Sequence, residues 1–270
     1  MLEPLLKWPG GKRKLLTHLS AFLPSKFERY FEPFLGGGAF FFGLQPSASI
    51  LSDINNELIE CYEVVRDHPD HVIEYLSRQE GTEEWYYSVR SSCPATKVER
   101  AGRLIYLLTL SFNGIHRTNR KGQFNVPYGH RPHLHPKDPE EIRSISKALR
   151  NAILRCGDFA STVADAGAGD LVYFDPPYTV AHGQNGFLRY NAKIFSWDDQ
   201  HRLASTARDL VSRGCHVIVS NADHPSITDL YQGFSVARVA RYSTIAADQQ
   251  HRRLVSECIF YSEPEKCSRT

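Results

Sequence analysis

The residues best suited to chemistry in this sequence are Asp175, Pro176, Pro177 and Tyr178, which follow a short apolar run. Consecutive prolines lack backbone N–H donors and have a restricted φ, so the main chain of this turn offers only carbonyl oxygens. The Asp175 carboxylate and the Pro176 carbonyl can therefore accept both N–H groups of a nucleobase amine such as that of adenine. The carboxylate would also stabilise positive charge developing on that nitrogen. Tyr178 offers a ring on which an extruded base can stack.

A second candidate is the glycine run Gly36, Gly37 and Gly38, which follows an aromatic stretch ending at Phe34. Glycine allows a sharp turn and a close approach of the backbone to a ligand. Asp53 ends the next predicted strand, 17 residues after Gly36, where a carboxylate can accept both hydroxyls of a ribose. The spacing predicts a nucleotide-like ligand, and NAD bound by an oxidoreductase is one alternative.

The elements that must position these residues alternate between strands and helices at both ends of the chain, which is typical of a doubly wound α/β fold. The apolar run 171–174 is continuous, as expected of a parallel strand covered on both faces, and Asp175 then lies at its carboxyl end. Helical periodicity over 57–80 and 98–110 predicts an insertion. Strands are predicted over 30–34, 50–53, 152–156, 171–174, 217–221, 235–239 and 254–261, the last two as an antiparallel edge, with a further helix over 198–213.

The stretch from 100 to 137 has no Asp or Glu, where the average acid content of the chain predicts about four. A β-hairpin is predicted over 117–128, turning near Lys121 and Gly122. This window indicates a basic patch suited to phosphates, with a solvated surface as the alternative. Its basic residues are Arg100, Arg103, Arg117, Arg120, Lys121, Arg131 and Lys137.

Composition excludes several classes of protein. A chain of 270 residues with 41% hydrophobic and 23% charged residues is neither disordered nor fibrous. The six cysteines form no C-x-x-C pair, which favours a reducing compartment, and no apolar run reaches membrane-spanning length, so a cytoplasmic protein is predicted. His130, His133 and His135 lack the spacing of zinc ligands, and no metal is expected.

Four strings, in their order along the chain, closely resemble the Dam-like family of DNA adenine (N6) methyltransferases with the alpha-type motif order. They are Lys7-Trp8-Pro9-Gly10-Gly11-Lys12, Glu32-Pro33-Phe34-Leu35-Gly36-Gly37-Gly38, Asp53-Ile54-Asn55 and Asp175-Pro176-Pro177-Tyr178. Two further strings, Asn113-Gly114 and the run 122–129, resemble the signature of the family's recognition hairpin. The match covers most of the chain.

The resemblance implies an α/β, Rossmann-like S-adenosylmethionine-dependent methyltransferase sheet with an inserted helical target-recognition domain that bears a β-hairpin. The catalytic domain would comprise 1–56 and 152–270, and the recognition domain 57–151. The methyl group would pass to the N6 amine of an adenine flipped out of double-stranded DNA, with Asp175, Pro176, Pro177 and Tyr178 as catalytic residues.

The same resemblance implies two sets of binding residues. Cofactor contacts would come from Trp8, Gly11, Lys12, Glu32, Pro33, Phe34, Gly36, Gly37, Gly38, Asp53, Ile54, Asp158, Phe159 and Asp175. DNA contacts would come from Lys7, Asn113, Arg117, Asn119, Arg120, Lys121, Asn125, Pro127 and Tyr128. A hairpin arginine can read guanine, while its neighbours neutralise phosphates.

The recognition sequence stays open, because Thr118, Arg120, Lys121 and Gln123 depart from the commonest pattern of the family. GATC is the first candidate by resemblance. A monomer is expected, with a restriction endonuclease acting on the same site as a candidate partner. Two further functions stay open: an inactive DNA-binding module, and a methyltransferase acting on RNA or on N4 of cytosine, although such enzymes more often carry Ser or Asn at the position of Asp175.

Overall fold

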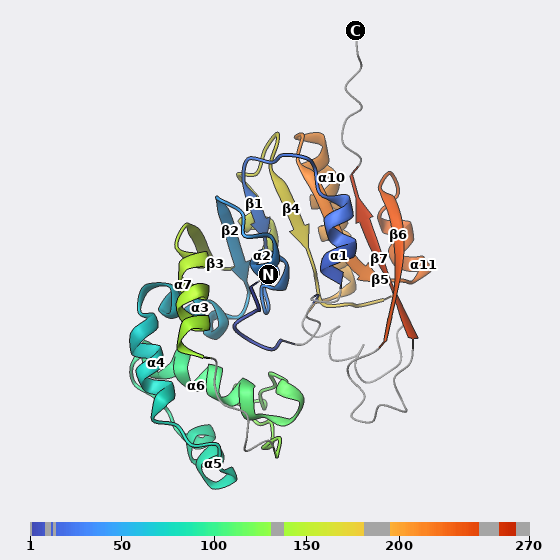
Figure 1. Cartoon of the computed structure of the whole chain (residues 1–270). Coiled ribbons are helices and arrows are strands. Elements are labelled where there is room, and N and C mark those ends of the chain that lie inside the picture. The colour runs from blue at the N-terminus through green and yellow to red at the C-terminus, as the bar shows by residue number, and fades with distance from the viewer. Residues whose placement is uncertain are drawn as a thin grey trace. The chain divides into compact units, whose positions relative to one another are not determined.

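The computed structural model describes residues 2–8, 12, 15–130, 138–180, 195–242 and 254–262 (Figure 1). The chain divides into two compact units. The first unit consists of Met1–Arg13, Leu35–Ser47 and Ser52–Gly157. The second unit consists of Lys14–Phe34, Ala48–Leu51 and Asp158–Thr270.

The strands form a seven-stranded sheet of order β3-β2-β1-β4-β5-β7-β6. β1 pairs in parallel with β2 and β4, and β4 in parallel with β5, whereas β7 is antiparallel to both β5 and β6. The predicted α/β class, with a parallel centre and an antiparallel edge, is therefore confirmed. The strands span Tyr30–Glu32 (β1), Ser49–Asp53 (β2), Ala152–Cys156 (β3), Leu171–Phe174 (β4), His216–Ala222 (β5), Ser235–Tyr242 (β6) and Leu254–Tyr261 (β7).

The strand order reverses between β1 and β4, which are adjacent in the sheet although about 140 residues separate them in the chain. In open α/β sheets, ligands bind beyond the carboxyl ends of the strands at such a switch point. Asp175 follows β4 directly, so it lies at the end of the sheet where chemistry is expected.

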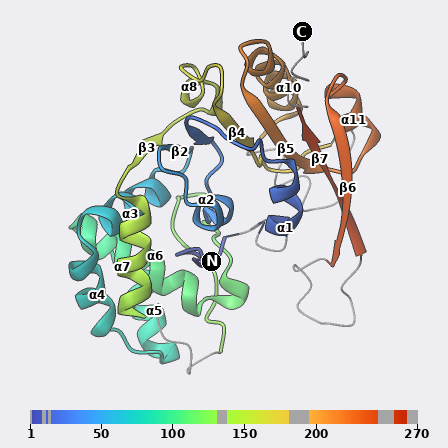
Figure 2. The same ribbon diagram turned by 45° about the horizontal axis from the view of Figure 1, so that its top comes forward.

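The core of the second unit explains the continuous apolar strands. All four residues of β4 are buried, and Val217 and Val219 of β5 lie in the same cluster. α10 (Trp197–Ser212) packs its apolar face against β5 (Figure 2), and Ser196 and Asp199 form a capping box at its first turn. The other helices of this unit are α1 (Leu16–Leu19), η2 (Ser20–Phe22), α8 (Phe159–Thr162) and α11 (Pro225–Leu230).

The first unit is mainly helical, and α3, α4, α6 and α7 pack on one another within it (Figure 2). The prediction of a single helix over 57–80 is wrong. α3 ends at Asp67, and α4 begins at Pro69, because proline suits the first turn of a helix and not its interior. The helices are α2 (Ala39–Leu44), α3 (Asn56–Asp67), α4 (Pro69–Ser77), α5 (Glu83–Ser91), α6 (Lys97–Leu110), η3 (Phe112–Gly114) and α7 (Pro139–Leu149).

Two of these helices, α5 and α7, are not among the elements that the sequence predicts. Both carry recognisable N-terminal signals, since Thr82 accepts a hydrogen bond from the backbone N–H of Trp85, and Pro139 follows the capping residue Asp138. Their apolar residues recur over only 9 and 11 residues. Short amphipathic segments of this kind are hard to separate from loops without their packing partners.

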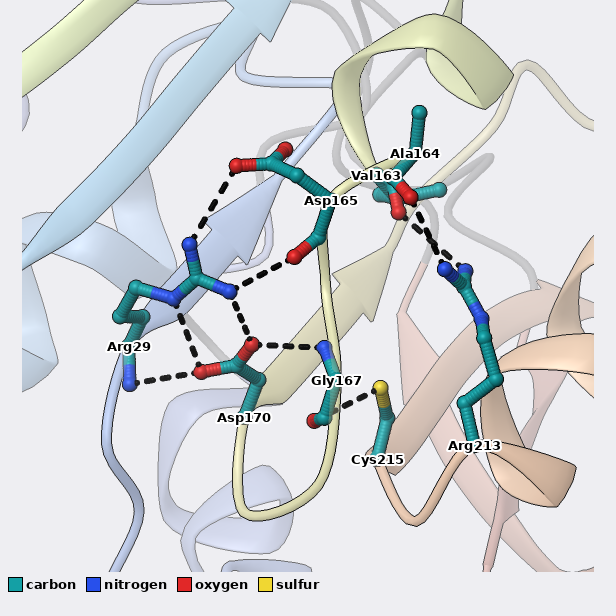
Figure 3. Close-up of polar contacts among 8 residues, drawn as sticks. All are labelled: Arg29, Val163, Ala164, Asp165, Gly167, Asp170, Arg213 and Cys215. Carbon is teal, nitrogen blue, oxygen red and sulfur yellow. Dashed lines mark hydrogen bonds and ion pairs between the residues drawn. The ribbon is translucent and has the colours of Figure 1, made fainter.

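A polar network holds the amino ends of three strands in the second unit (Figure 3). Arg29, just before β1, donates through Nη2 to Asp170 Oδ2 at 2.7 Å, and Asp170, just before β4, also accepts from the backbone N–H of Gly167 at 2.8 Å. Cys215 and Arg213, just before β5, donate to carbonyls of the same loop, those of Gly167, Ala164 and Val163. These bonds fix the strands at the end of the sheet opposite Asp175.

Candidate active site

The turn formed by Asp175, Pro176, Pro177 and Tyr178 is held by side chains from two neighbouring elements, and a third element holds one of these side chains. The Tyr178 hydroxyl donates to Glu257 Oε2 on β7 at 3.0 Å. Gln200 Nε2 on α10 lies 3.4 Å from the Pro177 carbonyl, and Asn221 Nδ2 on β5 donates to Gln200 Oε1 at 2.9 Å. Each support comes from a different element, so the turn has a defined conformation before any substrate binds.

Three buried tyrosines interact electrostatically with the Asp175 carboxylate, and Tyr30 interacts more strongly with Glu32. Burial raises the pKa of Tyr30, Tyr173 and Tyr178 well above the ordinary value, and the negative charge of Asp175 raises each further. All three phenols are therefore protonated at neutral pH. The Asp175 carboxyl group therefore has buried phenol hydroxyls as near neighbours.

Two more carboxylates complete this cluster. Glu32 is buried and accepts a hydrogen bond from the Tyr30 hydroxyl at 2.8 Å, and Glu257 is only 2% exposed. The Tyr173 hydroxyl lies 3.0 Å from Ser220 Oγ on β5. The hydroxyls thus hydrogen-bond to neighbours, which keeps the buried anions from being isolated charges.

Glu257, Gln200 and Asn221 are the residues of this site that sequence reasoning missed. Gln200 and Asn221 are fully buried polar side chains, and Glu257 is a single acid within the apolar strand β7. An acid at a position that the strand pattern assigns to the core is the available signal, because acids are almost never fully buried without a partner.

The glycine turn of the first unit has a backbone conformation and main-chain hydrogen bonds that favour glycine. Gly36 has φ +48° and Gly38 has φ +66°, a region that favours glycine. Leu35 N–H donates to the Ser52 carbonyl at 2.8 Å, and Gly38 N–H donates to the Leu35 carbonyl at 2.7 Å. A Cβ on Gly36 would lie 2.9 Å from Trp8 Cδ1, so both conformation and space require glycine.

Asp53 is tied to this turn through its carboxylate. Oδ2 accepts from Gly36 N–H and Oδ1 from Asn55 N–H, both at 3.0 Å. Burial raises the pKa of Asp53, while these amide hydrogen bonds act in the opposite direction. The Tyr62 hydroxyl donates to the Gly36 carbonyl at 3.0 Å, so the predicted pair Gly36 and Asp53 lies within one rigid hydrogen-bonded turn.

The other predicted cofactor residues fall into two groups. In the first unit, Trp8 is partly buried beside the glycine turn, Lys12 is buried, and Ile54 is 69% exposed. In the second unit, Phe34 stacks on Phe159 with ring centroids 5.5 Å apart. Asp158 caps α8 and pairs with Arg202, Pro33 follows β1, and Gly11 lies outside the described residues.

The predicted hairpin is present in a short form. Thr118 and Phe124 form a single antiparallel bridge, and Asn119 Oδ1 accepts from the backbone N–H groups of Lys121 at 2.9 Å and Gln123 at 3.1 Å. Arg117 Nε donates to Asn125 Oδ1 at 2.8 Å. Asn119 and Asn125 therefore shape the hairpin, while the Arg120 and Lys121 side chains are exposed at its turn.

The basic patch is narrower than the acid-free window. Arg100 forms two bonds of 2.7 and 2.8 Å with the Glu60 carboxylate, and Arg103 donates to the carbonyls of Val89 and Arg90. Both arginines therefore join helices to one another. Arg117, Arg120 and Lys121 remain as exposed basic residues of the hairpin, and Arg131 and Lys137 lie outside the described residues.

The remaining predicted DNA contacts differ in exposure. Lys7 is exposed and lies against Gly114, where an added Cβ would be 2.5 Å from Lys7 Cδ, so the structure brings together the strings that contain Lys7 and Asn113. Tyr128 is only 4% exposed, and its hydroxyl donates to the Gly81 carbonyl. Pro127 is exposed, but its carbonyl accepts from Phe112 N–H at 2.9 Å.

Within the described ranges, no group of three or more His, Cys, Asp or Glu side chains is arranged to hold a metal ion. His133 and His135 lie outside these ranges. The helices of the described residues are all too short or too polar to span a membrane.

Residues 8–245 match the model of the D12 class of N6 adenine-specific DNA methyltransferases. The chain belongs to this family. It is therefore an adenine-specific DNA methyltransferase, and DNA is its substrate. Membership of the D12 family decides against the oxidoreductase and against RNA or cytosine as the substrate, because the described activity is specific for N6 of adenine in DNA.

Relatives of this D12 methyltransferase match over nearly its whole length. The type II methyltransferase M1.LlaDCHI of Lactococcus lactis subsp. cremoris is 40% identical, over 96% of this chain and 94% of its own. The type II methyltransferase M.MjaIII of Methanocaldococcus jannaschii is 37% identical over 88% and 91%, and the DNA adenine methylase of Escherichia coli is 32% identical over 96% and 95%.

Proposed function

We propose that this D12-family enzyme transfers the methyl group of S-adenosylmethionine to N6 of an adenine flipped out of duplex DNA, with Asp175 to Tyr178 as the catalytic turn. The observation that carries this proposal is the position of the Asp175 carboxylate, directly after the buried strand β4 and at the carboxyl end of the sheet beside the switch point between β1 and β4. A carboxylate in such a place is suited to an amine that gains positive charge as it reacts.

The residues of the glycine turn fit a cofactor with a ribose and an amino-acid tail. A Cβ would lie 2.9 Å from Trp8 Cδ1 at Gly36 and 3.0 Å from the Leu6 carbonyl oxygen at Gly37, and the Asp53 carboxylate, held by backbone N–H groups, is an acceptor suited to a hydroxyl. Trp8, Lys12 and Gly38 lie with Asp53 in the same unit and are proposed to hold this cofactor. When bound, S-adenosylmethionine supplies a methyl group on a positively charged sulfur.

Aromatic residues of the second unit fit the base of the cofactor. Phe34 and Phe159 present stacked rings, and Asp158 begins the short helix α8 beside them. We assign these residues to the adenine ring of the cofactor. The remaining proposed contacts are Gly11, Glu32, Pro33 and Ile54.

The steps at the target amine follow from the catalytic turn. The Asp175 carboxylate and the Pro176 carbonyl accept its two N–H bonds and draw its lone pair away from the ring. As N6 gains its fourth bond, the negative charge of Asp175 stabilises the positive nitrogen, and an Asp175 oxygen accepts the proton that N6 then loses. Alignment of the two reactants supplies much of the acceleration.

Tyr178 is proposed to stack on the flipped adenine. Its raised pKa keeps the hydroxyl protonated, so the hydroxyl can donate to Glu257 without interruption. This hydrogen bond at the tip of the ring fixes the position of its far end. The ring is thereby held ready for the base.

The hairpin is proposed as the DNA-reading element of a recognition domain that spans 57–151. Its exposed residues Arg120 and Lys121 suit phosphates, and Arg117 or a neighbour would read guanine. Lys7 and Asn113 would contact DNA beside it, and GATC is the sequence to test first. The monomeric state and a partner endonuclease are part of the same proposal, the latter because two relatives are type II methyltransferases.

One experiment tests this proposal directly. The enzyme is incubated with plasmid DNA and S-adenosylmethionine labelled in the methyl group, and modified adenines are located by single-molecule sequencing. We expect label in N6-methyladenine at one short sequence, and loss of that label with Asp175→Ala. Label transfer by Asp175→Ala at the rate of the native enzyme contradicts the proposed role of the catalytic turn.

A further inference from the structure

His116 is a partly buried residue to which neither the sequence nor the proposed function gives a role. It immediately precedes the hairpin, and its ring stacks on Trp8 with centroids 4.8 Å apart and planes inclined by 21°. Its Nε2 lies 3.4 Å from Glu57 Oε2 at the start of α3, and the His116 side chain is 13% exposed. The ring is therefore held on a face by Trp8 and at an edge by Glu57.

Trp8 connects this histidine to the glycine turn. Trp8 Cδ1 fills the space beside Gly36, and a Cβ added to Gly37 would lie 3.3 Å from Trp8 Cβ. Gly36 in turn donates its N–H to Asp53. A shift of the Trp8 ring would therefore change the backbone that is proposed to hold the cofactor.

His116 also contacts the hairpin. The Phe124 ring meets it edge-on with centroids 5.8 Å apart, and Phe124 is 7% exposed and forms the antiparallel bridge with Thr118. His116 thus contacts both Phe124 and Trp8, and all three residues belong to the first compact unit. The hairpin and the glycine turn are joined by contiguous packed rings.

We propose that His116 is a positioning residue that couples the hairpin to the glycine turn, so that DNA bound to the hairpin raises the affinity for the cofactor. This inference rests on the proposed function, in which the turn holds S-adenosylmethionine and the hairpin holds DNA. Linkage requires the reverse effect to be equal, so bound cofactor must raise the affinity for DNA by the same factor.

The test measures this coupling factor. S-adenosylhomocysteine, the cofactor without its methyl group, is titrated calorimetrically into the full chain, with and without a short duplex containing the adenine located by methylation mapping. The coupling factor is the ratio of the dissociation constants of S-adenosylhomocysteine without and with the duplex. We expect it to be about 5 or more in the native protein and nearly 1 in His116→Ala. His116→Phe preserves a ring that can stack, and we expect it to restore most of the factor.

Three other results of the titration would contradict either the coupling or the proposed function. A purely structural His116 would weaken binding equally with and without the duplex, leaving the factor unchanged in His116→Ala, which overturns the coupling. A native protein that binds the cofactor with no response to DNA overturns it as well, while the proposed function survives. A native protein that binds no S-adenosylhomocysteine contradicts the proposed function itself.

A matched histidine provides the control. His130 follows the hairpin, whereas His116 precedes it. The His130 side chain is 74% exposed, and its ring contacts Tyr128 rather than Trp8. His130→Ala is expected to keep the native coupling factor. Thermal unfolding followed by circular dichroism shows that each variant is folded at the titration temperature.

Discussion

The catalytic turn after β4 and the glycine turn before α2 are both short loops that follow parallel strands, yet they are held by different means. The catalytic turn is supported by side-chain hydrogen bonds with Glu257 and Gln200, and Asn221 in turn donates to Gln200. The glycine turn depends on the positive φ of Gly36 and Gly38 and on main-chain hydrogen bonds of Leu35 and Gly38, to which the Asp53 and Tyr62 side chains add one bond each at Gly36. The first should tolerate replacements that keep a hydrogen bond, whereas the second should tolerate no side chain at all.

The largest effect is expected at Asp175, where the side chain itself is proposed to act. Asp175→Ala should lower the rate of methyl transfer by about 1,000-fold or more, because the amine loses both an acceptor and the charge that stabilises it. Single-turnover transfer of labelled methyl groups measures the rate, and cofactor titration shows that binding persists. Asp175→Asn is the matched variant, and a rate within 10-fold of native for it would mean that the charge contributes little.

Gly36→Ala tests the main-chain turn. The added Cβ would meet Trp8 and hold an alanine at a positive φ, so we expect the catalytic efficiency for the cofactor to fall by about 100-fold through misplacement of the turn. Gly122→Ala is the control, because Gly122 has φ +76° but open space around it. In Gly122→Ala the positive φ should likewise lower the free energy of unfolding by about 1–2 kcal/mol. Its affinity for the cofactor should equal that of the native protein.

A smaller effect is expected at Glu257, which acts through Tyr178. Glu257→Gln weakens a charge-assisted hydrogen bond, and we expect the maximal rate to fall by about 10-fold, equivalent to about 1.4 kcal/mol. In a Tyr178→Phe background the same replacement should change the rate less than about 2-fold, because the bond is already absent. Fully additive effects in this double-mutant cycle would show that Glu257 does not act through Tyr178.

The smallest effect on activity is expected at Asp170, which lies at the other end of the sheet (Figure 3). Asp170→Ala removes the partner of Arg29 and of Gly167 N–H, and we expect a loss of about 2–3 kcal/mol in the free energy of unfolding. The Arg29 side chain is 38% exposed, which keeps this figure below that of a fully buried pair. Urea unfolding measures the stability, and methyl transfer at low temperature should stay within 2-fold of native.

The parts of the fold that sequence predicts well are those governed by local patterns. The predicted bounds of β7 and β4 agree with the structure to the residue, because continuous apolar runs bounded by polar residues distinguish covered strands. The break between α3 and α4 escapes prediction although Pro69 marks it, since the apolar periodicity resumes beyond the proline. The short helix α5 escapes prediction because its packing against α6 lies beyond any local window.

The residues of the candidate site also divide into those that a local sequence pattern identifies and those that it does not. Asp175, Gly36 and Asp53 can be selected from the chain because their chemistry is unusual at the ends of predicted strands. The sequence cannot show which arginines of the acid-free window are available to DNA and which are bound within the protein. The partners of Arg100 and Arg103 come from α3 and α5. Charge along a chain does not report which charges are already neutralised or hydrogen-bonded.

Sequence by itself determined the class of fold and the positions of the two candidate turns, 175–178 and 36–38, because proline, glycine and buried apolar runs restrict the backbone wherever they occur. Only the tertiary structure decided that Glu257 supports Tyr178 and that His116 stacks on Trp8. These pairs are separated by 79 residues and by about 108 residues along the chain, respectively. Contacts at such separations depend on how the strands and helices pack, which no local pattern encodes.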